Sequence, residues 1–221
     1  MTTTLDTKLV TDWCEVLPIV KPFYERFFGE EMLLRDINLH LADLDEETAG
    51  RTNLESGAID ICLNIPVEDV PKTLVHELAH KKYEEATGIG MFYYEKAKTI
   101  IPFLRGHYRR KKDLNWFLHE CVAKTVGYLF SGEDIVFNCK RLDGSTTERT
   151  MYATLDSALS DINSVERYGF NNKPLNKQLN ERAMFVGKYL AIKYENDPDL
   201  WSKLKQLRTL DDLKELVECE T

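Results

Sequence analysis

The chain has 221 residues, which is long enough to bury a sizeable core as one large domain or as a core with an appendage. Hydrophobic residues make up 43% and charged residues 30%, proportions that describe an ordinary soluble protein. The formal net charge of -8 argues against nucleic-acid binding through the surface as a whole.

The first elements predicted along the chain are a helix and a strand. Residues 10–28 are rich in apolar side chains and predict a helical region, interrupted or bent near Pro18 and Pro22. Polar and apolar residues alternate over 36–42, which is the period of a half-buried strand. His40 falls on the polar side of this strand, so we expect a surface histidine there.

A loop, a second strand and a well-delimited helix follow. Residues 43–57 are polar and rich in turn formers and predict a loop, whereas 58–65 alternate again and predict a strand. Negative charge at Asp69 and the proline at Pro71 are typical of a helix start. Gly88 supplies the expected stop.

This predicted helix carries the sequence H-E-x-x-H, formed by His76, Glu77 and His80. Side chains four residues apart lie on the same helix face, so the two imidazoles can hold one metal ion. Such ligands favour zinc, and Glu77 can reach a water on the metal and act as general base. The competing interpretation is two histidines on an ordinary amphipathic helix.

Further helices and one strand are predicted downstream. The expected elements are a helix over 92–104, a helix over 114–130, a strand over 135–139, a turn over 142–144, and helices over about 150–165, 175–194 and 211–219. From residue 147 onward we expect helix throughout. The basic run 105–112 is interpreted as a solvated loop or a helix end, or else as a patch that attracts acidic peptide or nucleic acid.

The third metal ligand separates the zinc-binding classes. Metzincins need glycine and histidine at the positions that Tyr83 and Ala86 occupy, so that class is excluded. Residues 114–123 offer Glu120 on a later helix. Helical spacing places Glu120 on one face with the small residues Ala123 and Gly127, which would let this helix approach the first one closely.

The run 114–123 resembles W-[LF]-x-E-G-x-A, the segment that carries the third zinc ligand in gluzincin metallopeptidases. Peptidases of the immunity-repressor-cleaving type, which pair H-E-x-x-H with a Glu-x-x-Ala helix, are similar over the same stretch. The resemblance implies a zincin-like core with Glu120 as third ligand. It departs from the gluzincin pattern at Cys121, at one extra residue after Trp116, and at Lys124, where thermolysin-like enzymes have an aspartate that orients a zinc histidine.

Other side chains compete for these roles. His119, His107 and Glu84 are alternative third ligands, and Cys121 could be a soft ligand or a small buried residue. For the donor that stabilises the oxyanion, the candidates are His107, His119, Tyr128 and Tyr152. The resemblance also implies that the strand before the metal helix forms the rim with which a substrate backbone pairs.

The fold expected is α+β and predominantly helical, with a zincin-like metallopeptidase core over 1–145, a small sheet before the H-E-x-x-H helix, and a packed helical extension over 146–221. The expected function is zinc-dependent hydrolysis of peptide bonds, as an endopeptidase, with a peptide or protein as substrate. The alternatives are an inactive zinc-binding protein of the same fold, and a helical protein that binds nucleic acid through 105–112.

The cysteines and the chain start bear on the compartment. Five scattered cysteines without a C-x-x-C pair fit reduced thiols better than a disulfide framework. The first residues lack the pattern of a signal peptide, and no run is long enough to span a bilayer. We therefore expect a cytoplasmic protein with no membrane partner and no general nucleic-acid partner.

Overall fold

The computed structural model describes residues 13–33, 37–44, 48–53, 56–90, 105–140, 146–168 and 175–219. This part of the chain is mostly helical with a small sheet. The helices are α1 (Trp13–Phe28), α2 (Val70–Thr87), α3 (Arg105–Ser131), α4 (Leu155–Tyr168), α5 (Leu175–Lys193), α6 (Leu200–Leu204) and α7 (Leu210–Glu218). The strands are β1 (Asn38–Ala42), β2 (Gly50–Asn53), β3 (Ala58–Cys62), β4 (Ile135–Lys140) and β5 (Thr146–Met151).

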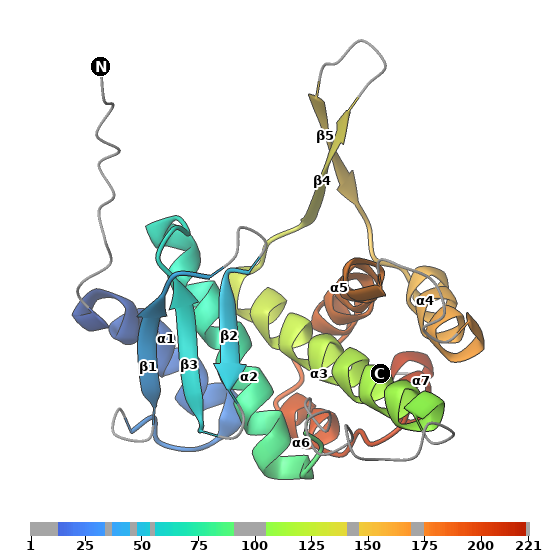
Figure 1. Cartoon of the computed structure of the whole chain (residues 1–221), viewed down its shortest axis with the longest axis horizontal. Coiled ribbons are helices and arrows are strands. Elements are labelled where there is room, and N and C mark those ends of the chain that lie inside the picture. Colours follow the sequence, from blue (N-terminus) through green and yellow to red (C-terminus); the bar gives the residue numbers. More distant parts are fainter. Residues whose placement is uncertain are drawn as a thin grey trace.

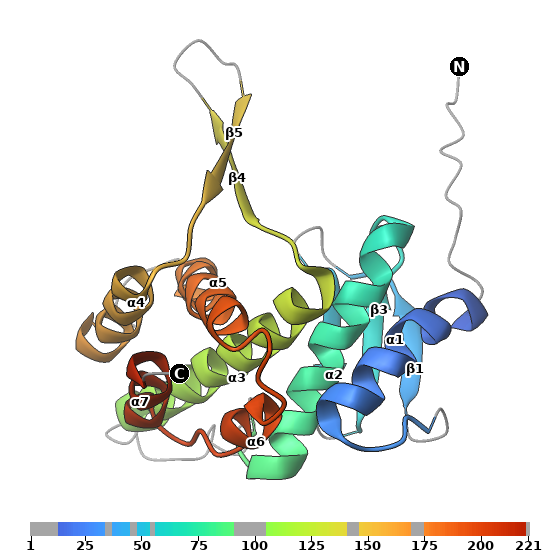
Figure 2. The ribbon, with the colours of Figure 1, turned by 180° about the vertical axis from the view of Figure 1, so that it is seen from behind.

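The sheet of β1, β3 and β2 lies in that order, with β1 parallel and β2 antiparallel to the central β3. Helices α1 and α2 lie together on one face of it (Figures 1 and 2). Ile59 and Ile61 are fully buried, whereas Arg51 and Asp60 form an ion pair of 2.7 Å. Alternate residues of a strand point to opposite faces, so one face is apolar and the other polar. His40 is exposed, as predicted.

Two predictions for the first half of the chain need correction. The helix was predicted to be interrupted or bent near Pro18 and Pro22, and the interruption is wrong, because α1 continues through both prolines. Both prolines are exposed, so water can satisfy the carbonyls that lose their helical donor. The segment 43–57, predicted as a loop, contains β2, because Gly50 and its neighbours pair with β3 despite their turn-forming composition. The strands predicted over 36–42 and 58–65 are confirmed as β1 and β3.

The bounds of α2 agree with the sequence signals. A short 3-10 turn, Val67–Asp69, leads into the helix, and Pro71 lies in its first turn. Gly88 ends the helix in the left-handed conformation with φ of 67°, and its backbone N–H donates to the carbonyl of Glu84. A residue without Cβ adopts this φ at no steric cost.

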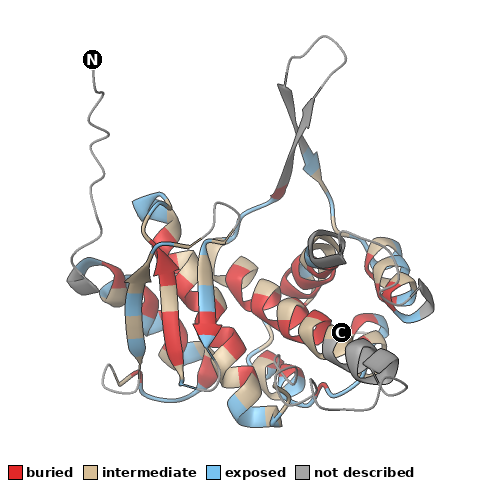
Figure 3. Ribbon diagram, in the orientation of Figure 1, coloured by how far each residue is buried: buried red, intermediate tan, exposed pale blue. Residues whose placement is uncertain are grey.

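Helix α3 is the centre of the molecule. It lies between α2 on one side and α5 on the other in both views, and buried residues concentrate on these helices and on β3 (Figures 1, 2 and 3). The helix predicted over 114–130 is confirmed, but it starts earlier, at Arg105, so the basic run 105–112 forms its first turns. The side chains of that run lie outside the described residues. A predicted loop or C-terminal helix end is therefore wrong there.

The second half differs from the prediction at its start. Residues 147–151, predicted as helical, belong to β5, which pairs antiparallel with the predicted strand β4. This hairpin extends away from the body (Figure 1). Three threonines in β5 explain the error, because β-branched residues fit a strand better than a helix. The proposed division between 1–145 and 146–221 falls between these paired strands and stays a prediction.

Helices α5 and α7 pack against α3, helix α4 packs against both of them, and this half of the chain also reaches α2. The hydroxyl of Tyr83 on α2 donates to the carbonyl of Leu207 over 2.8 Å, tying the two halves together through buried atoms. Helix α7 begins at a capping box formed by Thr209 and Asp212. The predicted helices over 150–165, 175–194 and 211–219 correspond to α4, α5 and α7, whereas α6 was not predicted.

Some predictions lie outside the described residues, namely the helix over 92–104 and the turn over 142–144. Within the described ranges, no helix combines the length and the apolar character needed to cross a membrane. Cys62 and Cys121 are buried thiols.

Candidate metal centre

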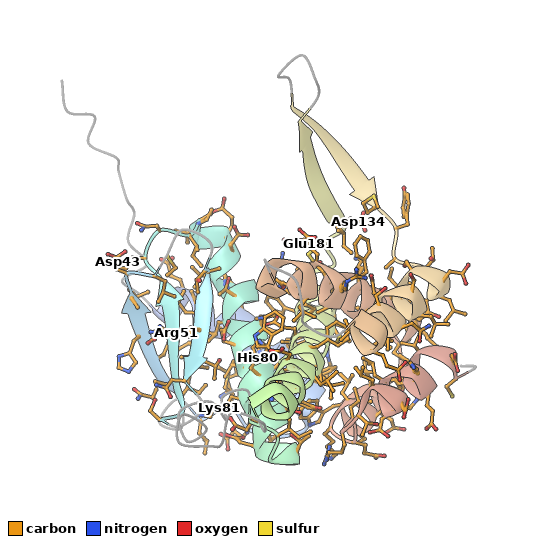
Figure 4. The ribbon with its side chains drawn as sticks, turned by 45° about the vertical axis from the view of Figure 1, so that its right-hand side comes forward. Asp43, Arg51, His80, Lys81, Asp134 and Glu181 are labelled. Atoms are coloured by element: carbon orange, nitrogen blue, oxygen red, sulfur yellow. The ribbon has the colours of Figure 1, made fainter. Side chains whose placement is uncertain are left out.

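Three side chains from two helices converge between α2 and α3. His76 and His80 lie one turn apart on α2, and their Nε2 atoms are 3.1 Å apart. Glu120 of α3 faces both rings, with one carboxylate oxygen 3.7 Å from His76 Nε2 and the other 3.5 Å from His80 Nε2. Figure 4 labels His80 in the interior, whereas Asp43 and Arg51 lie over the strands.

These separations suit a single metal ion. Atoms that occupy corners of a tetrahedron about 2.0–2.2 Å from zinc lie about 3.3–3.6 Å from each other. The potential ligand atoms of His76, His80 and Glu120 all lie within 4.8 Å of one another. Among the described residues, no other group of three or more histidine, cysteine, aspartate or glutamate side chains is arranged so that it could hold a metal ion.

Burial and mutual contact perturb these three groups in different directions. Burial alone would raise the pKa of Glu120, but its contacts with His80 and His76 outweigh burial and hold that pKa well below its usual range. Burial would lower the pKa of His80, yet the Glu120 carboxylate raises it. For His76, burial dominates and lowers the pKa. The carboxylate is therefore ionised, as a metal ligand must be.

The two imidazoles are held differently. The His76 ring hydrogen bonds to the backbone carbonyl of Ala123, and Gly127 leaves room beside its Nδ1, where a Cβ would lie 4.0 Å away. Both residues belong to the α3 face that was predicted to approach α2. A backbone carbonyl thus takes the orienting role that Lys124 cannot fill. The Nδ1 of His80 is buried and has no partner within the described residues.

Glu77 lies beside the three ligands and is fixed by strand β2. The buried hydroxyl of Thr52 donates to Glu77 Oε2 over 2.7 Å, and it also lies 2.9 Å from the Glu77 backbone carbonyl. A Cβ at Gly50 would lie 3.1 Å from Glu77 Oε1, so only glycine lets the strand lie this close. Burial raises the pKa of Glu77, which makes the carboxylate a stronger base.

A cavity of about 450 Å³ opens onto these groups. Its lining comes from the segment leading into β2, from the start of α2, from the middle of α3 and from α5. The lining residues are Thr48, Ala49, Gly50, Ile65, Asp69, Lys72, Thr73, His76, Glu77, Glu120, Lys124, Gly127, Tyr128, Asn180 and Met184. The predicted helical extension therefore supplies part of the cavity wall.

The rival ligands are not in this group. His119, next to Glu120, is fully buried on another side of α3, where its Nε2 donates to the carbonyl of Ile89 over 2.5 Å. Burial lowers the pKa of His119 to about 3. Glu84 lies two turns beyond Glu77, and Cys121 is a buried thiol whose pKa burial raises. The side chain of His107 lies outside the described residues.

Among the predicted oxyanion donors, Tyr128 lines the cavity and Tyr152 does not. Tyr152 is 79% exposed and lies near the base of the hairpin. The Nε2 of His119 already donates a hydrogen bond to the carbonyl of Ile89. Lys188 of α5 lies 5.3 Å from the centre of the Tyr128 ring and fixes the aromatic side chain in place.

The predicted substrate rim needs a correction. The strand before the metal helix, β3, has β1 on one edge and β2 on the other, so neither edge is open to a substrate. The strand that borders the cavity is β2, through Gly50. The sequence offered no signal for β2 or for Thr52, because their positions depend on strand pairing. Lys124 enters the sequence prediction only as a departure from the gluzincin pattern. Its place in the cavity could have been predicted, because it follows Glu120 by one turn on the same helix face.

Comparison of the chain with models of protein families, with curated proteins and with solved structures finds no match.

Proposed function

We propose that this protein is a zinc-dependent peptidase with a zincin-like core, in which His76, His80 and Glu120 hold the metal. The observation that carries the proposal is the placement of a fourth group, the buried carboxylate of Glu77, beside three converging ligands and within a cavity. A purely structural zinc site has its four ligands from the protein and needs neither a neighbouring base nor an open side.

The protein side chains divide the work. Bound zinc would polarise the scissile carbonyl and make a water molecule a nucleophile at neutral pH. Glu77 takes the proton of that water and later delivers it to the leaving amine. Thr52 holds Oε2 of Glu77, which leaves Oε1, beside Gly50, to receive the proton. Tyr128 is the phenol positioned to donate to the developing oxyanion.

The test is the variant Glu77→Gln, which keeps size and removes the base. We expect zinc content, measured by atomic emission, to equal that of the parent, and cleavage of a peptide library to fall by about 10²–10⁴-fold. The matched control is Glu84→Gln on the same helix, which removes one carboxylate outside the group of ligands and should keep cleavage near the parent rate.

Two results would contradict the proposal. If Glu77→Gln hydrolysed peptides as fast as the parent, Glu77 would not be the base. If the zinc-loaded parent cleaved no peptide in a broad library, the centre would bind metal without catalysing hydrolysis. The protein would then be a non-catalytic zinc-binding protein and not a peptidase.

A further inference from the structure

The cavity contains a cation with no role in the proposed chemistry. Lys124 lies on α3 one turn after Glu120, so both side chains project from the same helix face. Its position is set by α5, which crosses α3 so closely that a Cβ at Gly187 would lie 2.5 Å from Lys124 Cβ. The backbone that carries the Lys124 side chain therefore lies in the close contact between α3 and α5.

The other charges near the ligands have partners. Lys72 pairs with Glu133, Glu77 accepts from Thr52, and Glu120 faces the two imidazoles. Within the described residues, no hydrogen bond or ion pair of 4.0 Å or less forms at the Lys124 ammonium, although its charge acts on His76, Glu77 and Glu120. The carboxylates of Glu77 and Glu120 already balance a divalent ion, so the Lys124 charge is surplus in the cavity.

We propose that Lys124 binds a carboxylate of the substrate, so that the preferred substrates are peptides with an acidic group next to the bond that is cut. The inference rests on the proposed peptidase function and names the substrate class of that site. An ammonium and a carboxylate form a charge-assisted hydrogen bond, which strengthens where the cavity excludes water. Residues one helical turn apart are about 5–6 Å apart at Cβ, so the bound carboxylate lies adjacent to the reacting carbonyl.

The remaining acidic group of the cavity does not oppose this binding. Asp69 precedes α2, seven positions before His76, which corresponds to about 10 Å along the helix axis. At that distance, about one Debye length at ordinary ionic strength, its repulsion of a substrate carboxylate is weaker than the attraction of an ammonium in direct contact. Lys124 therefore determines the charge preference beside the ligands.

The experiment begins with digestion of a proteome-derived peptide library by the zinc-loaded protein. We expect aspartate and glutamate to be enriched at one position flanking the cleaved bond. Synthetic peptides from one cleavage site, differing only in Glu, Gln or Lys at that position, then measure the preference. For the parent, kcat/KM for the Glu peptide should exceed that for the Gln peptide by about tenfold or more.

Two variants assign the preference to one side chain. In Lys124→Gln the Glu-to-Gln ratio of kcat/KM should fall to about one, and in Lys124→Glu the Lys peptide should become the better substrate. The matched control is Lys72→Gln, which removes the same charge from the same cavity at a lysine that pairs with Glu133 and should keep the parent ratio. Zinc content and thermal midpoints of all variants establish that they are folded.

The carboxylate has two possible sources, a side chain or the end of the peptide. Peptides with a free C-terminus are compared with their amidated forms for this reason. A Lys124-dependent fall in kcat/KM on amidation assigns the C-terminal carboxylate, and a Glu-to-Gln preference that persists in the amidated peptides assigns the side chain. An acidic preference that Lys124→Gln retains, or an equal loss of rate on the three amidated peptides in Lys124→Gln, would overturn the proposal. The second result would mean that Lys124 acts on the reacting carbonyl.

A parallel binding measurement keeps this inference separate from the peptidase proposal. Zinc-loaded Glu77→Gln is mixed with the Glu, Gln and Lys peptides, and binding is followed by fluorescence polarisation. If the parent cleaves nothing, tighter binding of the Glu peptide that is lost in Glu77→Gln/Lys124→Gln still supports a carboxylate site, while the peptidase function fails. Equal binding of the three peptides, in their free and in their amidated forms, would overturn the carboxylate site.

Discussion

Helix α3 makes two very different contacts, with α2 on one side and with α5 on the other. Toward α2 it buries polar groups, including Glu120 against His76 and His80. Toward α5 the packing is close and largely apolar, with Gly187 against the α3 backbone. Burying polar groups costs stability, whereas close apolar packing supplies it. The comparison shows that the polar groups of the candidate metal centre lie on the α2 side of α3, whereas the α5 side stabilises the fold and positions α3.

The largest expected effect separates two neighbours on α3. Glu120→Ala removes a ligand and leaves two imidazoles facing the metal, so zinc affinity should fall more than 100-fold, beyond the loss usual for an orienting residue. His119→Ala leaves the ligands in place and removes a buried contact to Ile89, so it should lower the thermal midpoint while the folded protein keeps zinc.

Competition with a chromophoric chelator measures both affinities, and calorimetry measures both midpoints. If His119→Ala lost zinc as severely as Glu120→Ala while still folded, the assignment of the third ligand would be wrong. Equal zinc affinity of the parent and Glu120→Ala would show that Glu120 is not a metal ligand.

The next effect compares two glycines at the two contacts of α3. An alanine Cβ at Gly187 would lie 2.9 Å from the backbone nitrogen of Thr125, so the helices must separate. We expect Gly187→Ala to reduce the free energy of unfolding by about 1–3 kcal/mol. A Cβ at Gly127 would lie 4.0 Å from the nearest atom, so Gly127→Ala should be neutral or stabilising by up to about 1 kcal/mol through helix propensity.

Urea unfolding of the zinc-free proteins measures both free energies. A Gly187→Ala protein as stable as the parent would show that the α3–α5 contact does not constrain the fold.

The metal ligands could be predicted because they follow from local spacing. His76 and His80 need only a regular helix, and the stop at Gly88 and the start near Pro71 delimit that helix. Glu120 was predicted from the resemblance of 114–123 to the gluzincin segment, and the small residues Ala123 and Gly127 on the same helix face supported it. The signals from spacing each lie within one helix, where the period of 3.6 residues determines which side chains share a face.

The rest of the site could not be predicted, because it depends on contacts between distant segments. Thr52 reaches Glu77 only because β2 pairs with β3 in a register that places Thr52 opposite Ile59. Asn180 and Met184 reach the cavity only because α5 packs across α3. Pairing register and helix packing are settled by burial across the whole chain, and the composition of 43–57 favoured a loop.

A smaller effect is expected at the strand that supports the base. Thr52→Val keeps the shape of the side chain and removes the hydroxyl that donates to Glu77, so kcat should fall about tenfold. The same hydrogen bond opposes the effect of burial on the pKa of Glu77, so its loss should raise that pKa further. The acidic limb of the pH profile of kcat/KM should therefore move to higher pH. Thr52→Ser restores the donor and should restore both values, whereas a loss of rate without a shifted limb would indicate a structural role alone.

The smallest effect concerns protons that compete with zinc. Burial and the Glu120 carboxylate act in opposite directions on His80, and the carboxylate raises its pKa above the usual range. A proton on His80 must leave before the metal binds, so zinc affinity should fall as pH decreases through that raised pKa, by about tenfold per pH unit below it. Glu120, whose pKa is lowered, stays ionised over this range, and His119, with a pKa of about 3, stays neutral.

In Glu120→Gln the carboxylate that raises the pKa of His80 is gone, so the decline in zinc affinity should begin at lower pH. Chelator competition across mildly acidic pH measures the onset, and an identical onset in both proteins would show that Glu120 does not act on His80.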